Sequence, residues 1–236
     1  MRVIVFTCVI GKTDALKRPN AINKGVRYVC FSDRSQVVAP YELVRVPTGV
    51  DPRLTSRQIK IAADHPVLAE ADATFWHDAA FRLECDPVRL ATDLLSDSNM
   101  VALKHPHRTQ IEDEALAIDQ WGYVPMATMQ AQIAAYRADG FQQSHITSTG
   151  LCIRRTTPAL AAFNAFWWQQ VQQWGWRDQM SVDYAMWKTG VTATYMPGHY
   201  RNNKYATWFL NTSNRLPVRR SAQPSMRTKL PVRVAR

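Results

Sequence analysis

Near the start of the chain lies the stretch Val3-Ile4-Val5-Phe6-Thr7-Cys8-Val9, which predicts a buried strand. Six further strand-like runs follow it, and stretches with helical spacing separate them. These runs are Tyr28 to Ser32, Leu43 to Val46, Thr74 to Trp76, Met100 to Lys104, Leu151 to Arg154 and Thr192 to Tyr195. The alternation predicts an α/β fold, in which helices cover both faces of a mostly parallel sheet.

Several helices have recognisable ends. Asp86 and Pro87 predict a helix start, because Asp accepts hydrogen bonds from the first free amides and Pro fits the first turn. Gly140 predicts a helix end. The helices expected from spacing and end signals cover Ser56 to Asp64, Val88 to Ser96, Glu112 to Gln120, Ala127 to Ala138 and Ala159 to Trp174.

The length and charge predict one domain with a tail. A chain of 236 residues fits a single domain, residues 1–213, followed by a basic segment, residues 214–236. A hydrophobic share of 46% and a charged share of 20% exclude a wholly disordered chain. The tail holds seven basic residues and no acidic one, which leaves only +3 of the net +10 on the domain. Its prolines predict an extended or disordered arm.

The composition also gives expectations about location and partners. We expect a cytoplasmic protein, because the sequence has no apolar run of roughly 20 residues and no secretory signal. The basic tail suits an anionic membrane surface and would place the protein at the inner face of the membrane. Nucleic acid is disfavoured as a partner, because the tail has no aromatic residue on which bases could stack.

Polar residues at the ends of predicted strands are the first candidates for a site, because ligands of open parallel sheets bind beyond the carboxyl ends of the strands. Thr7 and Cys8 end the first strand, Asp33 follows the second, and His77 and Asp78 follow Thr74 to Trp76. Asp78 could hold a divalent cation that neutralises a leaving diphosphate. Alternatively, its carboxylate caps the next turn.

Four other groups of residues are candidates, and the first three each have a structural alternative. Arg57 and Lys60 lie three apart on one helix face and could bind phosphate or form a solvated surface. His105 and Arg108 lie in a basic loop that could face an anion or pair with the acidic helix start at Glu112 to Glu114.

Asp178 and Gln179 lie just before an amphipathic stretch, where Asp178 could cap the amides of Met180 or Ser181. Thr149 and Gly150 belong to a small-residue turn that a ligand could approach closely.

Several common chemistries find no support in the sequence. The chain has no GxGxxG after its first strand, no P-loop motif and no GxSxG elbow, which disfavours the usual dinucleotide and phosphate cradles and serine hydrolysis. The four cysteines are scattered singly, as is typical of reduced, mostly buried thiols.

Six motifs, read in order, resemble those of a glycosyltransferase-like family catalogued as domain of unknown function 616, which occurs in bacteria and in the plant Golgi. The motifs are Phe6 to Gly11, Tyr28 to Asp33, Ser56 to Lys60, Phe75 to Asp78, Leu103 to Arg108 with Glu112 to Glu114, and Trp176 to Ser181. The resemblance implies a single GT-A-like, Rossmann-like domain, distantly similar to glycosyltransferase family 8.

The resemblance also implies roles for individual residues. Thr7 and Cys8 would meet the nucleotide base, Arg57 and Lys60 would approach the phosphates, and Asp78 would hold the donor and a metal ion. Asp178 and Gln179 would lie near the transferred sugar, and His199 is loosely similar to a metal ligand of family 8. The implied reaction moves a sugar from a nucleotide-diphospho-sugar, by default a UDP-sugar, to a hydroxyl of a glycan, a lipid-linked acceptor or another molecule.

The chain departs from the family pattern at one position that matters for the mechanism. Asp78-Ala79-Ala80 offers one carboxylate where two would be expected, which leaves dependence on manganese or magnesium open. Without a metal ion, Arg57, Lys60, His105 and Arg108 would supply the positive charge. The alternative functions on the same fold are a hydrolase, including an amide-cleaving lipid hydrolase, or an inactive binding module whose basic tail holds an anionic partner.

Overall fold

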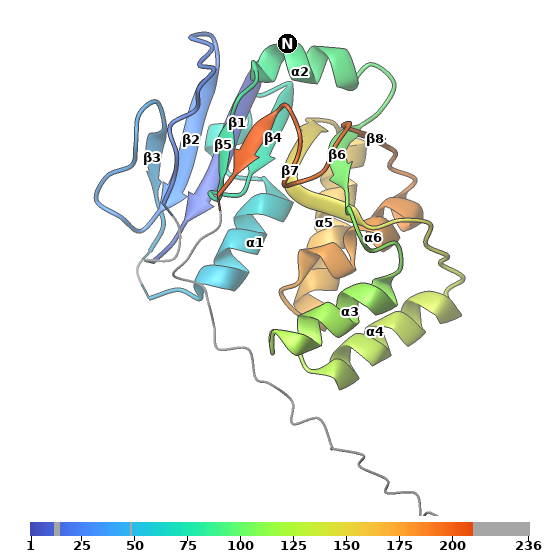
Figure 1. The fold of residues 1–236 in the computed structure, drawn as a ribbon. Helices are drawn as coiled ribbons and strands as arrows, with labels where there is room; N and C mark the ends of the chain where they lie inside the picture. The colour runs from blue at the N-terminus through green and yellow to red at the C-terminus, as the bar shows by residue number, and fades with distance from the viewer. Residues whose placement is uncertain (12–14, 48, 210–236) are drawn as a thin grey trace, which may run out of the picture.

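A seven-stranded sheet with the order β3-β2-β1-β4-β7-β6-β8 forms the centre of the computed structural model, which describes residues 1–11, 15–47 and 49–209 (Figure 1). All neighbouring strands pair in parallel except β7, which runs antiparallel to both β4 and β6. The strands are β1 (Val3–Val9), β2 (Arg27–Ser32), β3 (Glu42–Arg45), β4 (Ala73–His77), β6 (Met100–Lys104), β7 (Thr147–Arg155) and β8 (Ala193–Tyr195). The predicted α/β class and mostly parallel sheet are therefore confirmed.

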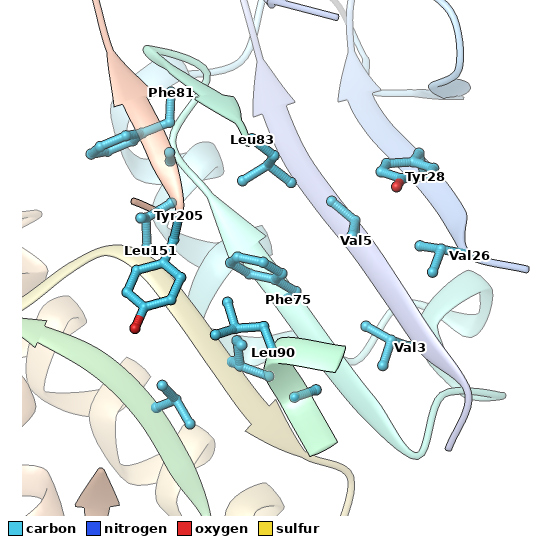
Figure 2. Close-up of a cluster of buried hydrophobic side chains, with 14 of the residues drawn as sticks. Val3, Val5, Val26, Tyr28, Phe75, Phe81, Leu83, Leu90, Leu151 and Tyr205 are labelled. Carbon is cyan, nitrogen blue, oxygen red and sulfur yellow. The ribbon is translucent and has the colours of Figure 1, made fainter. Parts of the chain in front are cut away.

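Two apolar clusters cover the two faces of the sheet, as alternate side chains of its buried strands require. On one face, Val3 and Val5 pack with Leu90 of α2 (Pro87–Leu94) and with a small antiparallel sheet of β5 (Phe81–Leu83) and β9 (Ala206–Trp208) (Figure 2). On the other face, Ile4 and Phe6 pack with α1 (Pro52–Ala62), α5 (Pro158–Trp174) and α6 (Val182–Thr189).

Two more helices, α3 (Ile111–Gln120) and α4 (Met126–Ala138), extend the second face and pack on each other around a third apolar cluster. In Figure 1 they lie below α5 and α6, away from β1, β2 and β3, and α4 contacts α5 while α3 contacts the turn at Asp178–Met180. Short 3₁₀ turns cover Pro66–Leu68 (η1) and Asp178–Met180 (η2). None of the helices in the described ranges is both long enough and apolar enough to cross a membrane.

Some boundaries differ from the predicted ones. Asp86 caps α2 as expected, and its carboxylate accepts from Val88 N at 2.9 Å. Helix α1 starts at Pro52, because Asp51 caps it by accepting from Leu54 N at 2.7 Å. The expected turn around Thr149 and Gly150 is instead an irregular part of strand β7. The predicted tail, residues 214–236, lies outside the described residues.

Candidate functional site

A cavity of about 200 Å³ opens beyond the end of β4, between α1, β7, η2 and the segment that joins β6 to α3. It is lined by nine of the predicted site residues, and these come from five separate segments of the chain. The predicted residues in its lining are Arg57, Lys60, Asp78, His105, Arg108, Thr149, Gly150, Asp178 and Gln179. The fold therefore brings most of the predicted site together.

A buried charge triad of Arg57, Lys60 and Asp178 forms one wall of this cavity. Arg57 Nε lies 2.8 Å from Asp178 Oδ1, and Lys60 Nζ lies 2.6 Å from Asp178 Oδ2. Lys60 is only 2% exposed, so the alternative of a solvated charged face is wrong. The expected capping role of Asp178 is also wrong, because both carboxylate oxygens face these two cations, and Ser181 N donates to the Asp178 main-chain oxygen.

The triad fixes the ionisation of Asp178. Burial alone would raise the pKa of this carboxyl, but Arg57 and Lys60 outweigh burial and hold the pKa well below its usual range. A carboxylate with such a low pKa has little affinity for a proton at neutral pH. Its environment therefore suits an orienting and charge-balancing group better than a general base.

Strand β7 positions the segment that carries Asp178. Thr149 Oγ1 donates to Asp178 Oδ2 at 2.9 Å, and two residues away Thr147 donates to Asp183 through its amide at 3.0 Å and through its hydroxyl. These hydrogen bonds from Thr149 and Thr147 hold η2 and the start of α6 against strand β7. A register irregularity between β6 and β7 separates this part of β7 from its regular part, and such bulges re-aim side chains next to sites.

Arg154, at the other end of β7, fixes the backbone of α1. Its guanidinium donates to the carbonyl of Ile61 at 2.9 Å, to the carbonyl of Lys60 and to Asn164 Oδ1 at 2.6 Å. The last carbonyls of a helix lack partners within the helix, and a cation there is favourable. The sequence analysis missed Arg154, although a cation in an apolar strand is a recognisable signal.

Asp78 is held from its main chain and from its side chain. Its amide donates to Gly150 O at 2.8 Å, and the indole of Trp76 donates to Asp78 Oδ1 at 2.8 Å. The same oxygen lies 3.9 Å from Lys60 Nζ, and the side chain of Asp78 is 39% exposed. The alternative of a capping carboxylate is wrong, because Phe81 N donates to the main-chain oxygen of Asp78. One oriented carboxylate thus faces the cavity.

Gly150 lies so close to Asp78 and Phe81 that only a glycine fits without movement. A Cβ atom at this position would lie 2.9 Å from Phe81 Cε2 and 3.3 Å from Asp78 Oδ2. The expected close approach at Gly150 therefore exists, but the neighbours are protein atoms.

We expect Gly150→Ala to displace Phe81 or the Asp78 carboxylate, with a fold stability lower by about 1–3 kcal/mol from overpacking. Misplacement of a substrate-facing group should lower turnover by about 10- to 100-fold. Steady-state transfer kinetics and urea denaturation measure both effects. Gly25→Ala is the control, because its Cβ would meet only Asn23 Oδ1, at 3.3 Å. Equal kinetics for the two variants would contradict the prediction.

A second charge triad, in which two partly exposed arginines, Arg108 and Arg177, share the buried carboxylate of Glu114, also lines the cavity. Arg108 Nε lies 2.6 Å from Glu114 Oε2, and Arg177 Nη2 lies 3.2 Å from Glu114 Oε1, while Glu114 itself is 1% exposed. Of the two alternatives for the basic loop, the structure therefore shows the pairing of Arg108 with the acidic helix start. Glu114 and Arg177 were missed as site residues. The signal was present, because Glu114 shares the apolar face of α3 with Ile111, Ala115 and Ile118.

His105 lines the cavity as a neutral ring. Burial and the charge of Arg108 lower the pKa of His105 to about 4. Its Nδ1 accepts from Arg108 N at 2.9 Å and from His107 N at 3.2 Å, which leaves Nε2 as the protonated nitrogen. The expected positive charge at His105 is therefore absent at neutral pH, and the ring supplies a hydrogen-bond donor.

Five predicted residues lie outside the cavity lining. One is His199, and the other four, Thr7, Cys8, Asp33 and His77, lie toward β1, β2 and the opposite face. Thr7 is fully buried, and burial raises the pKa of the Cys8 thiol to about 12. Asp33 joins the ends of β1 and β2, since its two carboxylate oxygens lie 3.0 and 3.1 Å from Gly11 N. His77 faces away from the cavity and contacts Tyr41 OH through Nε2 at 2.8 Å, and burial lowers its pKa to about 4.

The described side chains do not fit a divalent cation held by the protein. His199 lies beside the cavity, with its ring centroid 6.1 Å from that of Tyr200 and 6.3 Å from that of His107. Manganese and magnesium need several oxygen ligands in a compact shell. Within the described ranges, no three His, Cys, Asp or Glu side chains are gathered in such a way. Asp78 would be a single ligand, with the cation Lys60 next to it.

Aromatic side chains complete the cavity, and the sequence analysis assigned them no role. Phe81, Tyr200 and Trp208 contribute from the small sheet and the turn before it, and Trp121 from the end of α3. The side-chain amide nitrogen of Gln179 is buried and has no hydrogen-bond partner among the described residues. Most of the lining is charged or polar, so these four aromatic rings form the apolar part of the wall.

A family model described as TOD1/MUCI70, glycosyltransferase-like domain, matches residues 33–207. This range contains every residue of the cavity lining except Trp208. No curated protein matches the chain.

Proposed function

The chain belongs to the TOD1/MUCI70 glycosyltransferase-like domain family, and from this premise we propose that it transfers a sugar from a nucleotide-diphospho-sugar to a hydroxyl acceptor. The donor in this proposal is a UDP-sugar, on a GT-A-like domain distantly similar to glycosyltransferase family 8. The acceptor is a glycan or a lipid-linked sugar, and the enzyme acts in the cytoplasm, at the inner face of the membrane.

The observation that carries the proposal is the pair of charge triads. Arg57 and Lys60 share the single carboxylate of Asp178, and Arg108 and Arg177 share that of Glu114. Each triad therefore keeps one net positive charge next to the cavity. A diphosphate carries negative charge that grows as it leaves the sugar, and preorganised cations stabilise that charge in the transition state. No divalent cation is needed for this step in the proposal.

The remaining residues of the cavity would orient the donor. The exposed carboxylate of Asp78 can accept from sugar or ribose hydroxyls, and the free amide N–H groups of Gln179 can donate to them. Asp178 keeps Arg57 and Lys60 in place, so that they need no reorganisation when charge develops. The nucleotide base of the donor would lie toward the ends of β1 and β2, where Cys8 and Asp33 are found.

A thermal-shift panel tests the proposal. The panel contains nucleoside diphosphates and nucleotide-sugars, each with and without manganese. A ligand at 100 times its dissociation constant should stabilise the protein by about 2.7 kcal/mol, and we expect a UDP-sugar to do so in both conditions. Absence of any shift across the panel contradicts the proposal and favours an inactive scaffold. Release of free sugar without an acceptor would indicate hydrolysis.

A further inference from the structure

Trp121 differs from other exposed apolar residues of this protein. Its side chain is 43% exposed, and it also lines the cavity that holds Asp78 and Asp178. The large apolar side chains with comparable exposure among the described residues include Leu54, Leu116 and Trp187, and none of these lines the cavity. Exposed apolar surface that continues into a polar cavity marks a ligand-binding surface.

The indole of Trp121 is presented by a fixed turn. Trp121 follows the last residue of α3, and its amide donates to Ile118 O at 3.2 Å. Gly122, at φ 65°, then reverses the chain in a conformation that favours glycine. The amides of Gly122 and Tyr123 donate back to Asp119 O at 2.8 Å and Ile118 O at 3.3 Å. A ligand would therefore meet a ring whose backbone is already ordered.

The neighbouring rings support Trp121 and have their faces occupied. Tyr123 lies between Trp121 and Trp176, with ring centroids 5.7 Å and 5.2 Å away. Arg53 and Arg177 lie over both Tyr123 and Trp176, at 5.0 to 5.7 Å from the ring centroids. Within the described ranges no cation lies over Trp121. Its ring is the part of this aromatic group left for a ligand.

We propose that Trp121 is the platform on which the acceptor glycan of the proposed transfer reaction stacks one of its sugar rings. A pyranose has a face of C–H groups, which an aromatic face attracts through its partial negative charge. In the proposed reaction the donor occupies the cavity, which is open to solvent, so the acceptor would enter from the open side. Trp121 lies at the boundary between cavity and solvent, where that acceptor would arrive.

The test compares three variants on immobilised oligosaccharides of defined sequence, both neutral and acidic. Trp121→Ala should lower glycan binding by about tenfold, the change that one aromatic contact is expected to give. Trp121→Phe should keep part of the binding. Trp187→Ala is the matched control, because Trp187 is 46% exposed and packs on Phe141 and Tyr184 away from the cavity. It should bind glycans as the unchanged protein does.

Thermal stabilisation by UDP, measured on the same proteins, should be the same for all three variants. The inference is overturned if Trp121→Ala binds glycans normally. It is also overturned if Trp121→Ala is no longer stabilised by UDP, since that result would mean that Trp121 stacks on the nucleotide base. It is also overturned if the unchanged protein cleaves a UDP-sugar but binds no oligosaccharide. This inference rests on the proposed function. Failure of the proposed function can be told apart from failure of the inference, because in that case no nucleotide or nucleotide-sugar would stabilise even the unchanged protein.

Discussion

Asp178→Asn is expected to lower the free energy of unfolding by about 3–5 kcal/mol, because it leaves buried cations without their counter-ion. Arg57 and Lys60 lie 2.8 and 2.6 Å from the two oxygens of Asp178, whose side chain is 5% exposed. In the variant these cations would repel each other in a place that water hardly reaches. Urea denaturation at pH 7 measures the loss.

The pH dependence of this loss gives a second, independent readout. The folded-state pKa of Asp178 is held far below the usual carboxyl value, so its stabilisation is complete above the unfolded pKa of about 3.9. It is lost as the pH falls from there toward the folded pKa. The difference between wild type and Asp178→Asn should therefore be constant above about pH 5 and shrink below about pH 4.

Asp139→Asn is the matched control. Asp139 Oδ2 lies 2.6 Å from Lys188 Nζ, the same distance as in the Lys60 pair, but this pair lies on the surface. Exposed ion pairs contribute little, because water screens them. A denaturation midpoint that moves as far for Asp139→Asn as for Asp178→Asn would show that burial of the triad is not what stabilises it.

Lys60→Met is expected to lower turnover by about 10²- to 10³-fold, the loss typical of removing one preorganised group that stabilises developing charge. Lys60 Nζ donates to Thr149 Oγ1 at 2.8 Å and to Asp178, and it lies 3.9 Å from Asp78 Oδ1. It is therefore the cation that connects both carboxylates of the proposed donor site. Methionine keeps the apolar stem and removes the charge together with the two hydrogen bonds that the ammonium group donates.

Single-turnover transfer rates, measured beside far-UV circular dichroism, separate a loss of catalysis from a loss of fold. Lys188→Met is the control for a surface lysine in an ion pair of the same length and should transfer at the normal rate. An unchanged rate for folded Lys60→Met would remove Lys60 from the mechanism. If Lys60→Met does not fold, the measurement is repeated with Lys60→Arg. This variant keeps the charge and should recover the fold but only part of the transfer rate.

The strands of the central sheet could be predicted from the sequence, because an apolar run is a local property. All seven predicted runs overlap a strand of the central sheet. Strands β5 and β9 were not predicted. Each has three residues, too few to show a period, and each pairs with a partner far away in the sequence.

The site was predictable where it depends on strand ends and not where it depends on side-chain direction. Asp78 faces the cavity and His77 faces the opposite side, which the two-residue period of a strand requires. The sequence analysis placed both residues at the donor and overlooked this alternation. The pairing of Asp178 with Arg57 and Lys60 could not be predicted from the sequence. It requires α1 and η2 to lie side by side, and their placement depends on how α1 packs on α5 and how η2 packs on β7.

The separation along the chain between Lys60 and Asp178 has a consequence for how the protein is made. These two residues are 118 positions apart, and Thr149, which donates to the same carboxylate, lies between them. A ribosome-bound chain that ends before Asp178 has already made β1, β4, α1 and Asp78, which lies 3.9 Å from Lys60. It lacks the carboxylate that pairs with both Arg57 and Lys60, at 2.8 and 2.6 Å. Docking of α1 on the sheet is therefore expected to be late during synthesis, and such non-local assembly is slow and exposes apolar surface. The partly made protein should depend on chaperones until η2 leaves the ribosome.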